Sequence, residues 1–364
     1  MMKDRDQKAK ALRLAVANRW LPQLEVDIEP LRALDAKAPL VTDLDVLAEM
    51  PDILTGFRSL VFDCKTKAKE SPVNRALWLS GLLKKMGGAH GFCILKKKSI
   101  ALDHRLFADA LGVTLVTESD FELYASSTSI DYKGKLGHMA SIDVWENYYT
   151  SVRKFKGLER GLSYLRSEYW LADSASDSCR KTLAVLRRLH PEFDPEKAAH
   201  VALFFDFSAL FARSLALIAN QVFKAHFHPD IQKDLSEALL VLLYGGREAY
   251  EHRNELYQRV LEKNSGQEVA SLSLPEWDAF LKLFRQLLDA PVDVQYCPSI
   301  LREVGFAYLE GDTQSAFAQT LCSERPQAAR FSILIAGYLA KASKLPHEFI
   351  KIADDLLIPL QPVA

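Results

Sequence analysis

The hydrophobic pattern of the chain changes its period near residue 126. Before this point, short segments such as LEVDIEPL at 24–31 alternate apolar and polar residues, which is typical of β-strands with one buried face. After this point the strand pattern disappears, and apolar residues recur every three to four positions, as they do in amphipathic helices. This change of period predicts an α/β domain followed by an all-α domain.

The first part of the chain predicts the element order α-β-β-β-α-β-α-β, which is a mixed sheet flanked by helices. The helices are expected at 7–21, 72–85 and 103–112, and the strands at 24–31, 39–48, 57–65, 91–96 and 113–117. Ser71 and Pro72 are typical of an N-cap followed by proline in the first helical position, and Gly87 ends that helix. We therefore expect an α/β domain over 1–126, a linker or connecting loop over 127–138, and a helical domain over 139–364.

The helical part contains the most apolar segment of the chain, VALFFDFSALFARSLALIAN at 201–220. It carries Asp206 and Arg213, and a charged side chain at the centre of a bilayer costs about 2.5–3.5 kcal/mol. The segment is therefore predicted to belong to a buried helix that runs from Asp194 to Lys224, and not to a membrane span. The charged start of the chain lacks the apolar region of a signal peptide, so we expect a cytoplasmic protein.

The distribution of cysteines and charges excludes several classes of site. The five cysteines are scattered and form no Cys-x-x-Cys pair, which argues against a disulfide framework and a structural zinc site. The sequence also contains no P-loop, no Gly-rich dinucleotide turn and no serine nucleophile elbow. The net charge is −1, but residues 51–100 hold ten Lys or Arg against three Asp or Glu. This basic stretch indicates either a surface that faces a polyanion or a solvated face.

The second and third expected strands form a hairpin that we take to be symmetric about Leu54. In this register Asp45 lies opposite Asp63, and Asp43 lies opposite Lys65. The strand period of two then gives a polar face with Asp43, Asp45, Asp63 and Lys65, and a core face with Leu44, Val46, Phe62 and Cys64. A slip of one residue in the register would move Asp45 to the other face.

Two carboxylates at directly opposed strand positions repel each other and need a compensating cation. Lys65 supplies one positive charge, and a divalent metal ion held by Asp45 and Asp63 would supply more. Carboxylate oxygens are hard ligands that suit Mg²⁺ or Mn²⁺, and such ions can activate water and orient a phosphodiester. The pattern therefore favours a metal-dependent phosphodiesterase centre in which Lys65 holds the attacking water or the phosphate. The alternative is an ordinary acid–lysine pair on an exposed strand face.

In this element order, VTDLDVLA followed by LVFDCK and a downstream helix resembles the PD-(D/E)XK nuclease superfamily. GFCILKKK with the later ADALGVTLVT is similar to its Mrr-like and resolvase-like branches. The resemblance implies a restriction-endonuclease-like fold, with Asp45 as the motif aspartate, Asp63 as the second metal carboxylate and Lys65 as the catalytic lysine. Asp43 would be an accessory acid. Many members also carry a glutamate on the first helix that joins the metal ligands, and residues 7–21 contain none.

Basic residues around this motif are candidates for contacts with backbone phosphates, which confer affinity without sequence preference. They are Lys67, Lys69, Arg75, Lys96, Lys97 and Lys98. We expect a nuclease that depends on Mg²⁺ or Mn²⁺, with DNA favoured over RNA and no membrane partner; the resemblance implies restriction, repair or anti-phage defence. A homodimer or a protein partner stays open. The main alternative is a nuclease fold without chemistry, a scaffold that binds nucleic acid or a partner.

Two histidine motifs in the helical part offer further alternatives. Arg247 and His252 have the Arg-x4-His spacing of HEPN ribonucleases, which would cleave RNA without a metal. His226 and His228 form a His-x-His motif, but they follow the predicted end of a helix, where the helix dipole favours histidine in any case. Of these two, the ribonuclease motif is kept as an alternative function.

Overall fold

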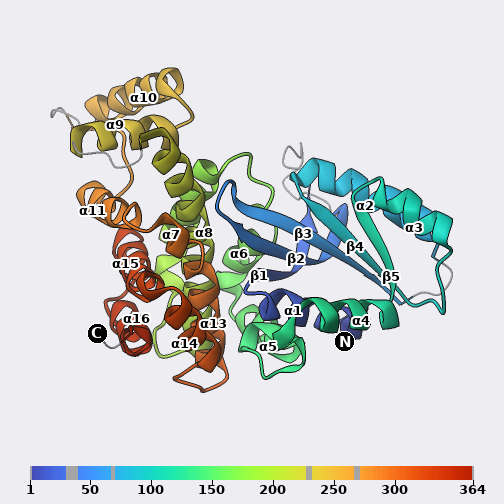
Figure 1. Cartoon of the computed structure of the whole chain (residues 1–364). Coiled ribbons are helices and arrows are strands. Elements are labelled where there is room, and N and C mark those ends of the chain that lie inside the picture. Colours follow the sequence, from blue (N-terminus) through green and yellow to red (C-terminus); the bar gives the residue numbers. More distant parts are fainter. Residues whose placement is uncertain (1, 30–39, 67–69, 227–231, 266–270, 363–364) are drawn as a thin grey trace.

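A five-stranded sheet packs against a larger set of helices in the computed structural model of the chain (Figure 1). The structure describes residues 2–29, 40–66, 70–226, 232–265 and 271–362. The strands are β1 (Leu21–Ile28), β2 (Thr42–Asp52), β3 (Gly56–Lys65), β4 (His90–Leu95) and β5 (Val113–Thr117). The helices of the same part of the chain are α1 (Arg5–Ala17), α2 (Pro72–Met86), α3 (Leu102–Asp109) and α4 (Glu118–Thr128).

The strands lie in the sheet in the order in which they follow in the chain. The first three are antiparallel neighbours. β4 and β5 run parallel to β3, because α2 and α3 carry the chain back across the sheet before each of them. The predicted mixed sheet and the predicted order of elements are therefore confirmed.

Helices cover both faces of the sheet, with α1 and α4 on one side and α2 and α3 on the other (Figure 1). Successive side chains of β3 alternate between these faces. Phe62 and Cys64 belong to the main hydrophobic cluster together with α1, whereas Val61 packs in a second cluster with Leu79 of α2. Because both faces are buried, the central strands are apolar on both sides, as the run LVF in β3 shows.

Local sequence rules explain where α2 begins and ends. The hydroxyl of Ser71 accepts the backbone N–H of Asn74 at 3.4 Å, and Pro72 is the first helical residue. Gly87 caps the C-terminus with a φ of 64°, a conformation that glycine adopts at little cost. The predicted helix is thus confirmed, and its first turn lies beside the end of β3.

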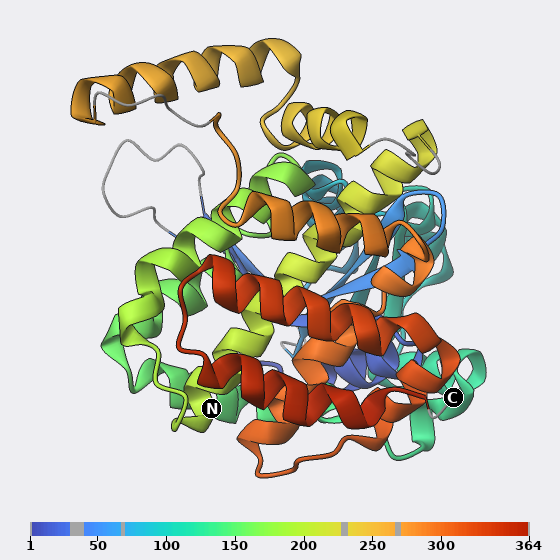
Figure 2. The same cartoon turned by 90° about the vertical axis from the view of Figure 1, so that its left-hand side faces the viewer.

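The described part of the chain after α4 forms helices and short 3₁₀ turns (Figures 1 and 2). The α-helices are α5 (Ile142–Arg153), α6 (Glu159–Arg166), α7 (Ala175–Leu189), α8 (Ala198–His226), α9 (Gln232–Leu243), α10 (Arg247–Ser265), α11 (Trp277–Leu287), α12 (Pro291–Val294), α13 (Cys297–Leu309), α14 (Ala316–Glu324), α15 (Pro326–Ala342) and α16 (Glu348–Leu357). α8 runs through the interior of this part, and α9 and α10 lie at its outer end in both views.

α8 begins at Ala198, so the predicted start at Asp194 is wrong. The chain makes a turn there in which the backbone N–H of Lys197 donates to Asp194 O, and the N–H of Asp194 donates to the imidazole of His200. These local bonds replace the first helical turn. Residues Ala198–Ala225 are long and apolar enough to cross a membrane by length and composition, but 89% of their most apolar window is buried inside the protein.

Buried ion pairs join the sheet to the helical part. Arg213 of α8 contacts Glu49 of β2 at 2.7 Å. Arg302 of α13 contacts Asp206 of α8 at 2.6 Å and donates to the carbonyl oxygen of Pro22 in β1 at 2.6 Å. The main hydrophobic cluster also continues from α1 through the sheet to α16. The α/β part and the helical part therefore share one core.

The segment at 127–138, predicted as a linker or connecting loop, packs on the structure from both sides. It contains the 3₁₀ turn η1 (Ile130–Lys133) and leads into η2 (His138–Ala140). The guanidinium of Arg13 in α1 donates to the carbonyl oxygens of Tyr132 and Gly134 at 2.6 and 2.8 Å. The buried carboxylate of Glu303 accepts the backbone N–H groups of His138 and Met139.

Candidate active site at a fork between β2 and β3

The hairpin of β2 and β3 opens into a fork at one end. Its pairs run from Asp52 with Gly56 to Val46 with Phe62, which is the register that symmetry about Leu54 predicts. Beyond this last pair, β2 continues beside β1, and β3 continues beside β4. The two strands therefore separate just where the sequence places its candidate carboxylates.

The alternation of side chains breaks next to the fork. Leu44 belongs to the cluster on the α2 side, whereas Val46 belongs to the main cluster on the α1 side, so the prediction that they share one face is wrong. The same switch occurs in β1 between Leu24 and Val26. Glu25 lies between these two residues with a φ of 52°. A left-handed residue interrupts the regular pleat of a strand, which accounts for the change of face in β1.

Asp45, Asp63 and Lys65 converge at this fork. The ammonium of Lys65 lies 3.0 Å from Asp45 Oδ2 and 3.2 Å from Asp63 Oδ1. The backbone N–H of Cys64 also donates to Asp45 Oδ2, at 2.7 Å. The side chains of the two aspartates are only 4% and 2% exposed, while that of Lys65 is 22% exposed. The structure thus brings together the three residues that the hairpin pattern singles out.

A second lysine, Lys8 of α1, reaches Asp45 from the other side. Its ammonium lies 3.1 Å from Asp45 Oδ1 and 3.0 Å from Glu25 Oε1, and its side chain is 1% exposed. Sequence reasoning missed this residue. A signal existed, because Lys8 precedes Leu12 and Ala15 at the spacing of the buried stripe of α1, a position where a charge needs a partner.

Arg75, in the first turn of α2, pairs with Asp63. Its Nε donates to Asp63 Oδ2 at 2.9 Å, and its Nη2 donates to Asp63 Oδ1. This is the bidentate geometry that makes guanidinium–carboxylate pairs strong. The ion pairs form one chain, from Lys8 on the α1 side through Asp45, Lys65 and Asp63 to Arg75 on the α2 side.

The surrounding charges fix the protonation of both lysines. Burial lowers the pKa of Lys65, but Asp45 and Asp63 outweigh this effect, and the pKa is raised above its ordinary value. Burial also lowers the pKa of Lys8, and Asp45 and Glu25 raise it by more. Both side chains are therefore ammonium ions at neutral pH that donate hydrogen bonds and do not act as bases. Burial raises the pKa of the Cys64 thiol, which stays neutral and packs as a small apolar group.

The donor set can be tested against a divalent metal ion. Two carboxylates suit Mg²⁺ or Mn²⁺. However, the oxygens of Asp45 already accept from Lys8, Lys65 and Cys64, and those of Asp63 accept from Arg75 and Lys65. Over the described ranges, three or more His, Cys, Asp or Glu side chains nowhere gather as a metal cluster would. The residues therefore fit a metal only after one of the cations leaves its carboxylate.

Gln7 of α1 is a further donor beside this centre. Its Nε2 donates to the carbonyl oxygen of Lys65 at 3.2 Å and to Glu118 at 2.7 Å. Its Oε1 is buried and has no hydrogen-bond partner. A buried amide oxygen without a partner is costly, and it is chemically suited to a hard metal ion or a bound water. Gln7 lies on the helix that contains no glutamate.

The other predicted site residues are Asp43 in β2, three lysines after β4 and two lysines outside the described residues. Asp43 is exposed and lies opposite Asp27 of β1. The predicted pairing of Asp43 with Lys65 does not occur, and neither does that of Asp45 with Asp63, because the β2–β3 ladder ends before those positions. Lys96 and Lys97 follow β4 at the same edge of the sheet, and the backbone N–H of Lys96 donates to Lys65 O at 3.0 Å. Lys98 follows them and is exposed. Lys67 and Lys69 lie outside the described residues.

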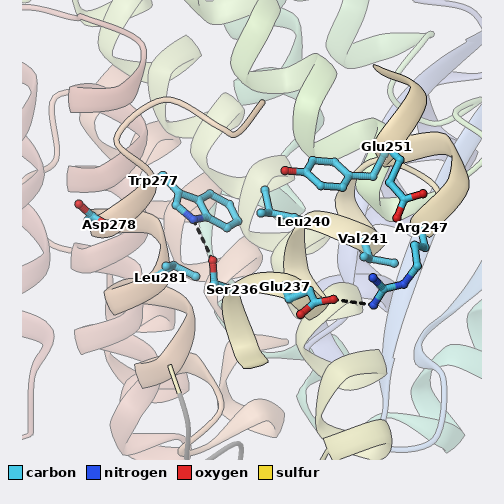
Figure 3. A pocket seen from close by; sticks show the side chains of 10 residues that line it. Ser236, Glu237, Leu240, Val241, Arg247, Glu251, Trp277, Asp278 and Leu281 are labelled. Atoms are coloured by element: carbon cyan, nitrogen blue, oxygen red, sulfur yellow. Dashed lines mark hydrogen bonds and ion pairs between the residues drawn. The ribbon is translucent and has the colours of Figure 1, made fainter. Parts of the chain in front are cut away.

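The two residues of the ribonuclease alternative lie in α10, far from this fork (Figure 1). Arg247 and His252 are both exposed, and Arg247 contacts Glu237 of α9 at 2.5 Å. Arg247 lines a cavity of about 640 Å³ between α9, α10 and α11, together with Trp277, whose indole donates to Ser236 (Figure 3). His252 does not line this cavity. The side chains of His226 and His228 lie outside what the structure describes.

Comparison with known proteins gives no relative for this chain: no family model, no curated protein and no solved structure matches it.

Proposed function

We propose that this chain is a metal-dependent nuclease that hydrolyses phosphodiester bonds, with DNA as the preferred substrate. The observation that carries the proposal is the convergence of two buried carboxylates, Asp45 and Asp63, on the ammonium of Lys65 at the fork between β2 and β3. Buried acids placed this close are costly unless their charge is compensated, so they are retained at sites of binding or catalysis more often than elsewhere.

The three converging residues have distinct roles in this proposal. Asp45 and Asp63 would hold a Mg²⁺ or Mn²⁺ ion, which when bound neutralises phosphate charge and lowers the pKa of water. Lys65 is a permanent ammonium, so it would orient the scissile phosphate or the attacking water by donating hydrogen bonds. Lys96 and Lys97, at the same edge of the sheet, would contact the backbone phosphates of the strand.

The test is a nicking assay on supercoiled plasmid with Mn²⁺ or Mg²⁺, comparing the wild type with Asp63→Ala. We expect nicking by the wild type and none by Asp63→Ala, while both bind DNA. Asp109→Ala, which removes an exposed carboxylate at the end of α3, is the matched control and should nick like the wild type. Equal nicking by Asp63→Ala would place the reaction elsewhere, and a single-stranded RNA substrate in parallel tests the preference for DNA.

A second candidate is a binding domain with the same fold and no chemistry. The positions of Lys8 and Arg75 favour it, because together with Lys65 they balance the three carboxylates of Glu25, Asp45 and Asp63 without a metal. A charge-balanced buried network can serve the fold alone. If neither the wild type nor Asp63→Ala nicks plasmid, and both retard DNA in a gel, this candidate replaces the nuclease.

A further inference from the structure

Arg75 occupies a position that is unfavourable for a cation. It lies in the first turn of α2, where the helix dipole is positive, and this turn contains no acidic residue. Two contacts hold it there: the bidentate pair with Asp63, and the Trp78 ring, whose centroid lies 4.1 Å from the guanidinium carbon. The charge of Arg75 is therefore balanced chiefly by a carboxylate that belongs to the candidate metal site.

A phosphate can take the place of that carboxylate. The planar guanidinium binds carboxylate and phosphate with the same bidentate geometry, so either partner satisfies Arg75. The side chain is 17% exposed, and the neighbouring Lys65 is 22% exposed, whereas Asp63 is 2% exposed. An anion that approaches the fork from solvent therefore meets Arg75 and Lys65 before it meets Asp63. The positive end of the α2 dipole adds to the attraction.

We propose that Arg75 exchanges partners when nucleic acid binds. Without nucleic acid it pairs with Asp63 and keeps a metal ion from that carboxylate. With nucleic acid it pairs with a backbone phosphate. Asp63 Oδ2 then loses its donor and can join Asp45 as a metal ligand, while Lys65 keeps its contact with Oδ1. The inference rests on the proposed nuclease function, and it makes metal binding depend on the substrate. By linkage, the metal must strengthen nucleic-acid binding by the same factor.

The experiment measures Mn²⁺ binding to the full chain by electron paramagnetic resonance, with and without a short phosphorothioate DNA duplex that resists cleavage. We expect the duplex to tighten Mn²⁺ binding to the wild type by a factor of about 10 or more. Arg75→Gln should bind Mn²⁺ that tightly without the duplex, and the duplex should add little. Arg75→Lys, which retains one charged contact, should lie between them.

Two controls separate this effect from a change in fold. Arg58→Gln removes an arginine that pairs with Asp52 near the turn of the same hairpin, and it should behave like the wild type. The double variant Asp63→Asn with Arg75→Gln should lose the tight Mn²⁺ site, which assigns the ion to the fork. Thermal melting by circular dichroism shows whether Arg75→Gln is folded, and Arg75→Lys provides the comparison if it is not.

The outcomes distinguish the two proposals. If the wild type binds Mn²⁺ equally well with and without duplex, and Arg75→Gln binds it no more tightly, the exchange of Arg75 is refuted. The nuclease function then still stands if nicking depends on Asp63. If none of these proteins binds Mn²⁺ and plasmid is not nicked, both proposals fail together.

Discussion

The carboxylate of Asp45 accepts the backbone N–H of Cys64 at 2.7 Å, at the level where β2 and β3 have already separated. The carboxylate thus accepts a backbone N–H of β3 that would have paired with β2 if the ladder between these strands had continued. This bond explains how the sheet tolerates the fork, and it gives Asp45 a structural role beside its proposed chemical one. For this reason Asp63→Ala is a cleaner test of chemistry than Asp45→Ala.

Replacement of Lys8 tests the buried end of the ion-pair chain. Lys8→Met leaves Glu25 without its closest cation and Asp45 with Lys65 alone, so the free energy of unfolding should fall by about 2–4 kcal/mol. Lys10→Met, on the same helix, removes a partly exposed lysine that lies 3.5 Å from Glu122 and should change stability by less than about 1 kcal/mol. Chemical denaturation measures both values; equal stabilities would refute the role of Lys8.

Replacement of Lys65 tests the proposed catalytic role of the ammonium. Lys65→Met should lower the rate of plasmid nicking by about 100-fold or more, because a hydrogen-bond donor aimed at the reacting phosphate is lost. DNA affinity, measured by fluorescence anisotropy, should change much less, since other cations supply the phosphate contacts. Lys84→Met, which removes an exposed lysine of α2, is the control for loss of charge. Nicking by Lys65→Met at the wild-type rate would remove this residue from the mechanism.

Part of this site could be predicted from local pattern. The two flanking strands and their turn fix the hairpin register, and a period of two then brings Asp63 and Lys65 to one end of β3. The order of elements along the chain followed from the alternation of helix and strand signals. These features depend on neighbours in the sequence, which is why a single chain reveals them.

The remainder of the site depends on contacts between distant segments. Lys8 meets Asp45 only because α1 packs on the sheet, and the left-handed Glu25 in β1 switches the faces of its neighbours without any glycine to mark it. The sequence marks Arg75 as a phosphate ligand, but not as the partner of Asp63. Strand periodicity alone shows neither the positive charges that Lys8 and Arg75 bring to the site nor the change of face at Glu25.

The lysines that follow β4 predict a salt-dependent contribution to DNA binding. If Lys96 contacts one phosphate, Lys96→Gln should reduce the slope of log affinity against log salt by about 0.9, and by a similar amount for different DNA sequences. Lys85→Gln, which removes an exposed lysine in the last turn of α2, is the matched control and should leave the slope unchanged. Fluorescence anisotropy over a series of salt concentrations gives the slopes. Identical slopes for Lys96→Gln and the wild type would exclude Lys96 from the interface.

His138 predicts how stability depends on pH. Its Nδ1 lies 2.9 Å from Glu303 Oε1 and its Nε2 lies 2.9 Å from Asp312 Oδ2. The hydrogen bond with Glu303 and the charges of both acids raise the pKa of His138 to about 9, against the partial desolvation that lowers it. The folded-state pKa therefore exceeds the unfolded one of about 6.5. Protonation favours the folded state, so this stabilisation is complete below about pH 6.5 and is lost as the pH rises through about 9.

The measurement compares chemical denaturation of the wild type and His138→Gln over this pH range. The stability of the wild type relative to the variant should fall by about 1–2 kcal/mol from about pH 6 to about pH 10, allowing for solvent screening at a side chain that is 21% exposed. His138→Gln retains the backbone N–H that donates to Glu303, so the turn at η2 keeps one of its anchors. Because Glu303 also accepts from Met139 and Ser315, the variant should still fold. Stability curves of the two proteins that run parallel across this range would show that His138 does not titrate between the two acids.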